Sequence, residues 1–196
     1  MQMTKFKSFR KSVVVSHVVA AAFLCLNVPA YAQGNTPQEI QASCKKFVQG
    51  FYNWYVPSLT KNANSPSPAI AIESKKSSFD PVLYRKLKDD FDASAKVTGE
   101  IVGLDFDPYL NAQDFGDKYV VSKVTPKKNG TYWVEVHSIM GGKRNPKPDV
   151  TPEVAYRKGR WQFVNFHYGK SDIPVNENLI SILNVLKKDR EKYGTK

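Results

Sequence analysis

Residues 118–140, KYVVSKVTPKKNGTYWVEVHSIM, contain the pattern that decides the fold. Apolar and polar side chains alternate on both sides of a central Lys-Lys-Asn-Gly segment, which predicts strands at Tyr119–Val124 and Tyr132–Met140. Asn129 and Gly130 favour a tight turn between the strands because both residue types accept a positive φ angle. This stretch therefore predicts an antiparallel β-hairpin.

A second hairpin is predicted further along the chain. Val150–Arg157 and Arg160–Tyr168 are both strand-like, and Lys158 and Gly159 favour a turn between them. Residues 141–149, GGKRNPKPD, join the two hairpins and predict a flexible basic loop. Four antiparallel strands are the expected result.

The residues before the hairpins have a helical period. Thr36 and Glu39 fit a capping box around Pro37, which predicts a helix over residues 36–55. Its apolar side chains recur at three- and four-residue spacing, at Ile40, Cys44, Phe47, Val48, Phe51 and Tyr55.

Two further helices are predicted. Asp80 followed by Pro81 marks the start of a short one, and Asn176 caps another that runs to about Tyr193. Residues 57–79 are rich in Ser, Pro, Asn and Lys and predict a long loop. The order helix, helix, antiparallel strands, helix predicts an α+β fold, with N-terminal helices packed on a curved antiparallel sheet and a C-terminal helix.

The first 32 residues match a secretory signal peptide. Four basic residues precede the apolar stretch Val13–Val28, and Ala30 and Ala32 are the small residues that favour cleavage before Gln33. We therefore expect export to the periplasm, or secretion, with residues 33–196 as one domain without a membrane span.

Two alternatives for this segment fit less well. A membrane anchor is disfavoured because the apolar stretch is short, is interrupted by His17 and has no basic flank after it. Lipid attachment at Cys25 is disfavoured because Leu24, the residue before it, is not small.

The exported part is moderately basic. Removal of residues 1–32 leaves 25 of the 29 Lys and Arg residues and all 18 Asp and Glu residues, a net charge of +7 (25 − 18). The basic residues are dispersed and no nucleic-acid-binding motif accompanies them, so nucleic acid is not expected as a partner. A protein partner or an anionic envelope component is the better match. Cys44 alone remains, which excludes an intramolecular disulfide and predicts a buried thiol.

Three strings carry a resemblance to a known family: FYNWYV at residues 51–56, LDFDPYLNAQDF at 104–115 and GRWQFVNFHY at 159–168. With the order of elements, they resemble an uncharacterised family of exported bacterial proteins described as a domain of unknown function. That family is similar to the cone-shaped, cystatin-like fold of nuclear transport factor two, scytalone dehydratase and ketosteroid isomerase. The resemblance implies a curved sheet wrapped against the first helices with a pocket between them, and it implies no particular reaction.

Two histidines are candidates for a site. Alternation places His137 on the strand face of Trp133, and it places His167 on the face of Phe163 in a strand without a bulge. The histidines can then meet in the pocket. No HxH or HExxH spacing is present, so neither a metal nor another cofactor is predicted. A structural histidine, satisfied by a hydrogen bond, is the alternative.

Two carboxylates are candidates as well. Asp105 and Asp107 lie in the central string, and an Asp in an apolar pocket can act as a general base. The alternative is turn chemistry, because an Asp beside Pro, Asn or Gly bonds to nearby backbone N–H groups. The spacing does not fit a calcium-binding loop.

Amphipathic aromatic residues form the third group of candidates. They offer a large apolar area with a polar tip, which suits a ligand cavity or a protein interface, or else they belong to the core. The candidates for binding a ligand or partner are Tyr52, Trp54, Tyr55, Tyr109, Trp133, Trp161 and Tyr168.

These observations favour an exported binding domain without catalysis, for example an immunity-type or envelope protein. The alternative is a small enzyme of isomerase, dehydratase or hydrolase type that uses Asp105 or Asp107 with His137 or His167. A carboxylate and a histidine within hydrogen-bonding distance inside an apolar pocket would favour the enzyme, and a pocket filled by aromatic side chains would exclude it.

Overall fold

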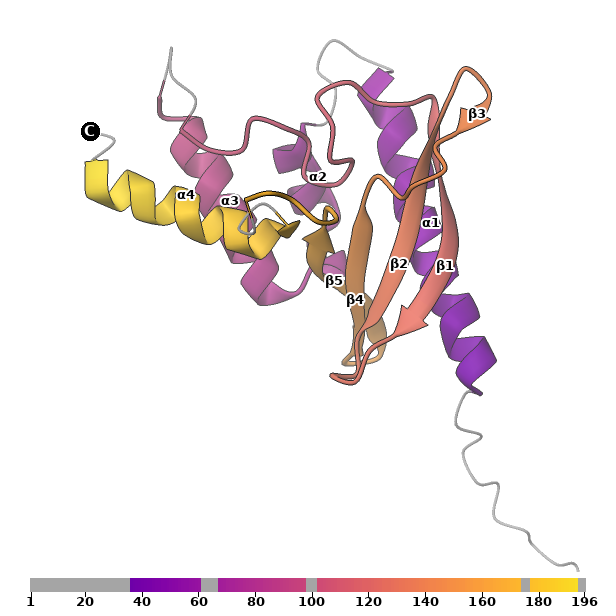
Figure 1. Cartoon of the computed structure of the whole chain (residues 1–196). Coiled ribbons are helices and arrows are strands. Elements are labelled where there is room, and N and C mark those ends of the chain that lie inside the picture. The colour runs from indigo at the N-terminus through magenta and orange to yellow at the C-terminus, as the bar shows by residue number, and fades with distance from the viewer. Residues whose placement is uncertain (1–35, 61–66, 98–101, 174–176, 194–196) are drawn as a thin grey trace, which may run out of the picture. The chain divides into compact units, whose positions relative to one another are not determined.

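The sheet has five antiparallel strands with the hydrogen-bonded order β1-β2-β4-β5, and a short β3 pairs with β2 (Figure 1). In this computed structural model the strands are β1 Lys118–Pro126, β2 Tyr132–Met140, β3 Lys143–Arg144, β4 Thr151–Arg157 and β5 Arg160–His167. Both predicted hairpins are confirmed. The predicted loop between them contains β3, which the basic sequence did not indicate.

The structure describes residues 36–60, 67–97, 102–173 and 177–193. The predicted signal peptide, residues 1–32, lies outside them, and its cleavage remains a prediction. Within the described ranges, no helix is both long enough and apolar enough to cross a bilayer.

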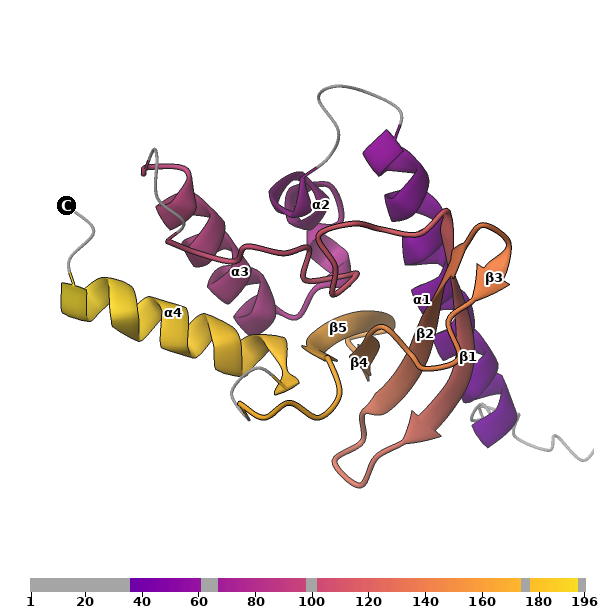
Figure 2. The ribbon, with the colours of Figure 1, turned by 45° about the horizontal axis from the view of Figure 1, so that its top comes forward.

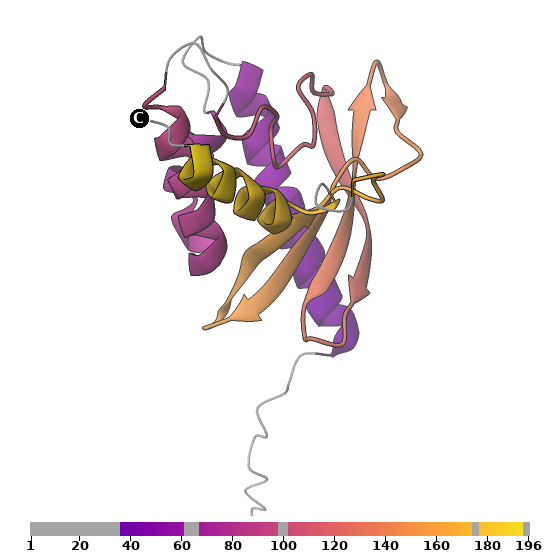
Figure 3. The same ribbon diagram turned by 60° about the vertical axis from the view of Figure 1, so that its left-hand side comes forward.

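Helix α1 spans Pro37–Thr60 and lies along one face of the sheet, against β1 and β2 (Figure 3). Its capping box is confirmed, because the Thr36 N–H donates to the Glu39 carboxylate at 2.7 Å and the Glu39 N–H donates to Thr36 Oγ1 at 3.2 Å. The helix continues through Pro57, beyond its predicted end. Burial of Val56 beside this proline offsets the backbone hydrogen bond that proline cannot make.

The predicted loop over residues 57–79 is wrong for much of its length. After the end of α1, Pro68–Ser74 form α2 and Lys76–Ser78 form a short 3-10 helix, η1. Pro68 occupies the first turn of α2, where proline is favourable, and Ala71 and Ile72 are buried. Tertiary packing therefore stabilises a helix that is too short to be seen from periodicity.

Helices α3, Pro81–Ser94, and α4, Leu179–Tyr193, lie side by side (Figure 2). The predicted cap of α3 is confirmed, because the Asp80 carboxylate accepts from the Val82 N–H at 2.9 Å. The predicted cap of α4, Asn176, lies outside the described residues. At the start of α4, the side chain of Asn178 accepts from the Ser181 N–H at 3.1 Å.

The α+β class, with helices before an antiparallel sheet and a helix after it, is confirmed. The two faces of the sheet differ. Val134 and Val136 of β2 point toward α1 and are fully buried. Trp133 and His137 alternate with these valines along β2 and therefore lie on the opposite face. That face of β1 and β2 carries no helix among the described residues (Figure 3).

Aromatic side chains fill the space between α1 and the sheet. The ring of Phe51 lies with its centroid 6.0 Å from that of Phe79, 5.5 Å from Tyr109 and 5.0 Å from Phe163. The family resemblance implies a pocket at this position. The structure has a packed aromatic core there instead.

Candidate functional site

Residues 104–115 fold into a tight turn built on Asp107. The Asp107 N–H donates to the carbonyl of Ala112 at 3.0 Å, and Oδ1 of Asp107 accepts from the N–H groups of Tyr109 and Leu110 at 2.8 and 3.2 Å. A short carboxylate side chain forms such bonds readily. Asp107 therefore has the turn role that its sequence context favours.

Tyrosine hydroxyls fix this turn to the rest of the domain. Tyr55 of α1 donates to Oδ2 of Asp107 at 2.5 Å. Three further tyrosine hydroxyls donate to backbone carbonyl groups: Tyr52 to Tyr109 at 2.8 Å, Tyr168 to Pro108 at 2.9 Å, and Tyr109 to Pro68 at 3.1 Å. These four candidate residues are thus brought together, with their hydroxyl groups committed to holding the turn.

A pocket of about 630 Å³ lies between this turn, the start of α2 and the end of α3. Asp105 and Asp107 line it on the side of the turn. Most of the remaining lining is apolar and includes Pro68, Ala69, Phe91, Leu104, Phe106 and Phe115. Phe115 is an exposed aromatic residue of this lining, at 37% of its full exposure.

The carboxyl group of Asp107 has a raised pKa. Burial raises the pKa of Asp107 to about 6, and the hydrogen bonds from Tyr55 and from two backbone N–H groups lower it only in part. Burial, and then the nearby Asp107 charge, raise the pKa of Tyr55, so its hydroxyl remains a donor. The site thus holds a carboxylate that gains from a cationic or hydrogen-bonding group beside it.

His137 does not reach this pocket. Its Nε2 lies 3.0 Å from Ser122 Oγ and its Nδ1 lies 2.9 Å from the carbonyl oxygen of Asn145. The side chain is on the helix-free face of the sheet, as alternation from Trp133 predicts, and it is 4% exposed. Its hydrogen bonds fit the structural alternative.

His167 lies on the face opposite to the predicted one. The register between β4 and β5 passes from Glu153–Asn165 to Val154–Phe163, so Val164 is the extra residue of a bulge. The bulge turns His167 away from Phe163, toward the helix-free face.

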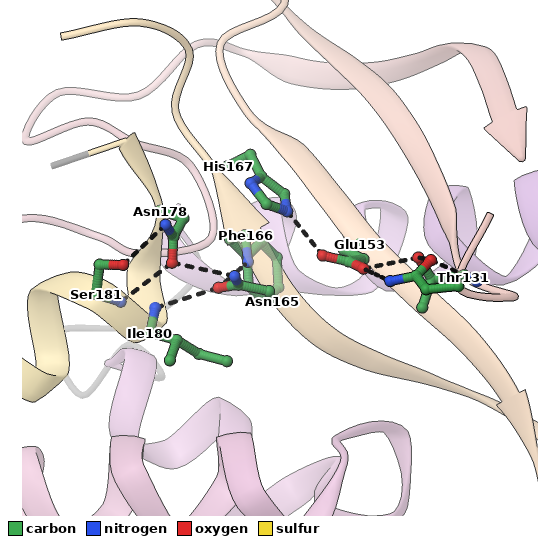
Figure 4. Close-up of polar contacts among 9 residues, drawn as sticks. Thr131, Glu153, Asn165, Phe166, His167, Asn178, Ile180 and Ser181 are labelled. Atoms are coloured by element: carbon green, nitrogen blue, oxygen red, sulfur yellow. Dashed lines mark hydrogen bonds and ion pairs between the residues drawn. The ribbon is translucent and has the colours of Figure 1, made fainter. Parts of the chain in front are cut away.

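There His167 joins a polar cluster that the sequence analysis missed (Figure 4). Its Nε2 lies 2.8 Å from Glu153 Oε2, and its ring centroid lies 4.0 Å from that of Trp133. Glu153 also accepts from Thr131 Oγ1 at 2.6 Å. These contacts lower the pKa of Glu153 to about 2, with the His167 hydrogen bond as the largest cause. The one feature of the sequence that could have indicated this cluster is Glu153, the single carboxylate within β4.

The structure does not bring Asp105 or Asp107 together with either histidine. Asp107 bonds to α1 on the core side of the sheet, and both histidines lie on the opposite face. The structure therefore does not support the Asp–His pair of the enzyme alternative. Within the described ranges, no three His, Cys, Asp or Glu side chains form a group that could hold a metal ion.

The remaining two candidates are separate from the pocket. Trp161 is 8% exposed and donates from Nε1 to Ser43 Oγ at 3.1 Å, which is a core role. Trp54 is half-buried, and the Nζ of Lys75 lies 4.6 Å from its ring centroid.

Comparisons with known proteins give a structural neighbour. No protein-family model matches the chain, and no curated protein matches it. A similar solved structure is a protein of unknown function from Bacteroides thetaiotaomicron VPI-5482, with 19% identity over 66% of this chain and 92% of that chain and a TM-score of 0.47. The neighbour is thus an uncharacterised bacterial protein, and a likeness of this degree transfers no function.

Proposed function

We propose that this chain is an exported binding domain whose pocket between segment 104–115, α2 and α3 takes a small amphipathic ligand. The observation that carries the proposal is the Asp107 carboxyl group, which Tyr55 fixes beside a largely apolar pocket. A concave, mostly apolar site with a few convergent polar groups and a perturbed pKa is the usual form of a small-molecule site.

The charges of the lining indicate the class of ligand. Asp105 and Asp107 are acidic residues of the lining, and no Lys, Arg or His is among the described lining residues. An apolar body with a cationic, N–H-bearing end would therefore be complementary. Catalysis is not part of the proposal because neither histidine is near these carboxylates.

Calorimetric titration with octylammonium and with octanoate tests this proposal. We expect octylammonium to bind more tightly, and Phe115→Ser to weaken it by about tenfold, since the variant removes an aromatic contact at the rim of the pocket. Met140→Ser is the matched control because Met140 is an exposed apolar residue outside the pocket lining. Equal loss of octylammonium binding in both variants would reject the pocket as the site, and so would octanoate binding that Phe115→Ser weakens to the same extent.

Export is tested separately. The predicted signal peptide at residues 1–32 motivates this part of the proposal. Expression of the full chain in a Gram-negative host, followed by fractionation and N-terminal sequencing, should give a periplasmic protein that begins at Gln33. An uncleaved chain in the cytoplasmic fraction would contradict export and would leave the binding proposal standing.

A further inference from the structure

A second groove, of about 580 Å³, lies between η1, the start of α3 and the start of β5. It is distinct from the Asp107 pocket and shares no lining residue with it. Its composition has two parts, an apolar floor and a basic rim. The floor includes Pro81, Tyr84 and the edge of Phe79, which is 1% exposed, and the rim includes Lys76, Arg85 and Arg160.

Hydrogen bonds between the elements fix the walls of this groove. Gln162 of β5 is buried and donates from Nε2 to the carbonyl oxygens of Ser77 and Phe79, at 3.3 and 3.2 Å. The Asp80 N–H donates to the carbonyl of Phe163 at 2.8 Å. The start of α3 and the start of β5 therefore hold one another in place, so the groove is formed before any ligand arrives.

The three cations of the rim lack a carboxylate partner among the described residues, and the Nζ of Lys76 lies 4.7 Å from the ring centroid of Tyr84. Among the described residues, none of Lys76, Arg85 and Arg160 forms an ion pair, and no Asp or Glu lines the groove. Arg160 also stands directly opposite Arg157 in the β4–β5 ladder, where like charges repel. Arg157 has a carboxylate partner, Asp80, whereas Arg160 has none among the described residues.

We propose that this groove binds a small amphipathic anion, a single-chain carboxylate whose head group pairs with Arg85 and Arg160. Guanidinium groups bind carboxylates through paired hydrogen bonds, and the apolar floor gives an alkyl chain a place to leave water. The volume of the groove lies in the range of small-molecule sites, which favours a single chain over a macromolecular partner. Positive charge at one site and negative charge at the other make the two proposals independent.

The probe is octanoate, titrated calorimetrically into the full chain, with acetate and octylammonium for comparison. We expect octanoate to bind at least about tenfold more tightly than acetate, since acetate has the charge but no alkyl chain. Protein variants then locate the site. Equal affinity for acetate would overturn the proposal, because the floor would then contribute nothing. Binding of octylammonium that competes with octanoate would overturn it as well.

The variant Arg85→Gln/Arg160→Gln should weaken octanoate binding by about tenfold or more. The charge-matched control is Lys128→Gln/Lys143→Gln, which removes two exposed cations outside the groove and should change the affinity by less than about twofold. Equal loss in both variants would assign the binding to net charge and reject the groove. All four side chains are exposed, so folding should persist, and far-ultraviolet circular dichroism checks this.

A last arm separates a free carboxylate from a lipid surface. Vesicles of phosphatidylglycerol and phosphatidylcholine are sedimented with the wild type and with Arg85→Gln/Arg160→Gln. We expect the two proteins to sediment alike. Loss of sedimentation in the variant, together with no heat from octanoate, would replace the proposed ligand with an anionic membrane.

Discussion

The hydroxyl of Tyr55 and the carboxylate of Asp107 lie 2.5 Å apart, although 52 residues separate them in the chain. This bond joins α1 to the turn at residues 104–115 and places the carboxyl group at the wall of the pocket. The turn and the candidate site therefore depend on the same contact.

Replacing Tyr55 by Phe should destabilise the domain by about 1 kcal/mol, because Oδ2 of Asp107 loses its donor. The pKa of Asp107 should also rise, since the Tyr55 hydrogen bond lowers it. Urea unfolding measures the first effect and carbon-detected NMR titration the second. Tyr156→Phe is the control because Tyr156 is exposed and its hydroxyl bonds only the nearby carbonyl of Gly159. Equal losses in the two variants would contradict the assigned role.

Asp107 should make the domain less stable as the pH rises from 4 to 7. Its pKa is about 6 in the folded protein, above the ordinary 3.8, so its favourable contribution is complete below pH 3.8 and is lost as the pH passes 6. The expected loss is on the order of 3 kcal/mol. It is measured as the difference in unfolding free energy between the wild type and Asp107→Asn across this range. A difference that is constant with pH would show that the pKa is not raised.

Glu153, in contrast, should make the domain less stable as the pH falls. Its pKa is lowered from 4.5 to about 2, so its contribution is present above pH 4.5 and is lost as the pH falls through 2. Allowing for partial exposure, Glu153→Gln should cost on the order of 1 to 2 kcal/mol at pH 6, and the gap to the wild type should close by pH 2. Glu191→Gln, an exposed change on α4, should show no such gap.

Loss of the buried ion pair between α3 and α4 should be costly. Asp90 is fully buried, and Nη1 of Arg190 lies 2.5 Å from its Oδ1. Arg190→Met leaves this carboxylate without its cation and should cost about 3 to 5 kcal/mol in urea unfolding. Lys192→Met, an exposed change two residues later, should cost little. Adding Asp90→Asn to Arg190→Met should restore part of the loss, and no restoration would contradict the charge argument.

Replacement of two glycines by Ala should change the stability of the domain in opposite directions. A Cβ on Gly103 would lie 2.1 Å from Ser94 Oγ and 2.7 Å from Oδ2 of Asp90, whereas a Cβ on Gly50 in α1 meets nothing within 4 Å. Gly103→Ala should therefore destabilise by about 1 to 3 kcal/mol, and Gly50→Ala should stabilise by about 0.5 to 1 kcal/mol. Thermal unfolding of both variants tests the pair, and a stabilised Gly103→Ala would refute the close approach.

The elements that could be predicted before folding is considered are those whose signals are local in the chain. Three such signals each lie within a few residues: the capping box at Thr36 and Glu39, the cap at Asp80 and the Asn129–Gly130 turn. The structure confirms the helix α1, the helix α3 and the β1–β2 hairpin that they predict. The alternation of the strands likewise placed His137 on its observed face. Such signals can be read because the interacting groups are neighbours along the chain.

Other features depend on residues that are distant in the chain and become visible in the folded protein alone. Helix α2 is stable because Ala71 and Ile72 are buried, and the bulge at Val164 reverses the face of His167. The pairing of Asp107 with Tyr55, in place of a histidine, arises from the packing of α1 against the turn. Periodicity and composition do not encode these outcomes, because burial, register and desolvation are set by parts of the chain that meet only on folding.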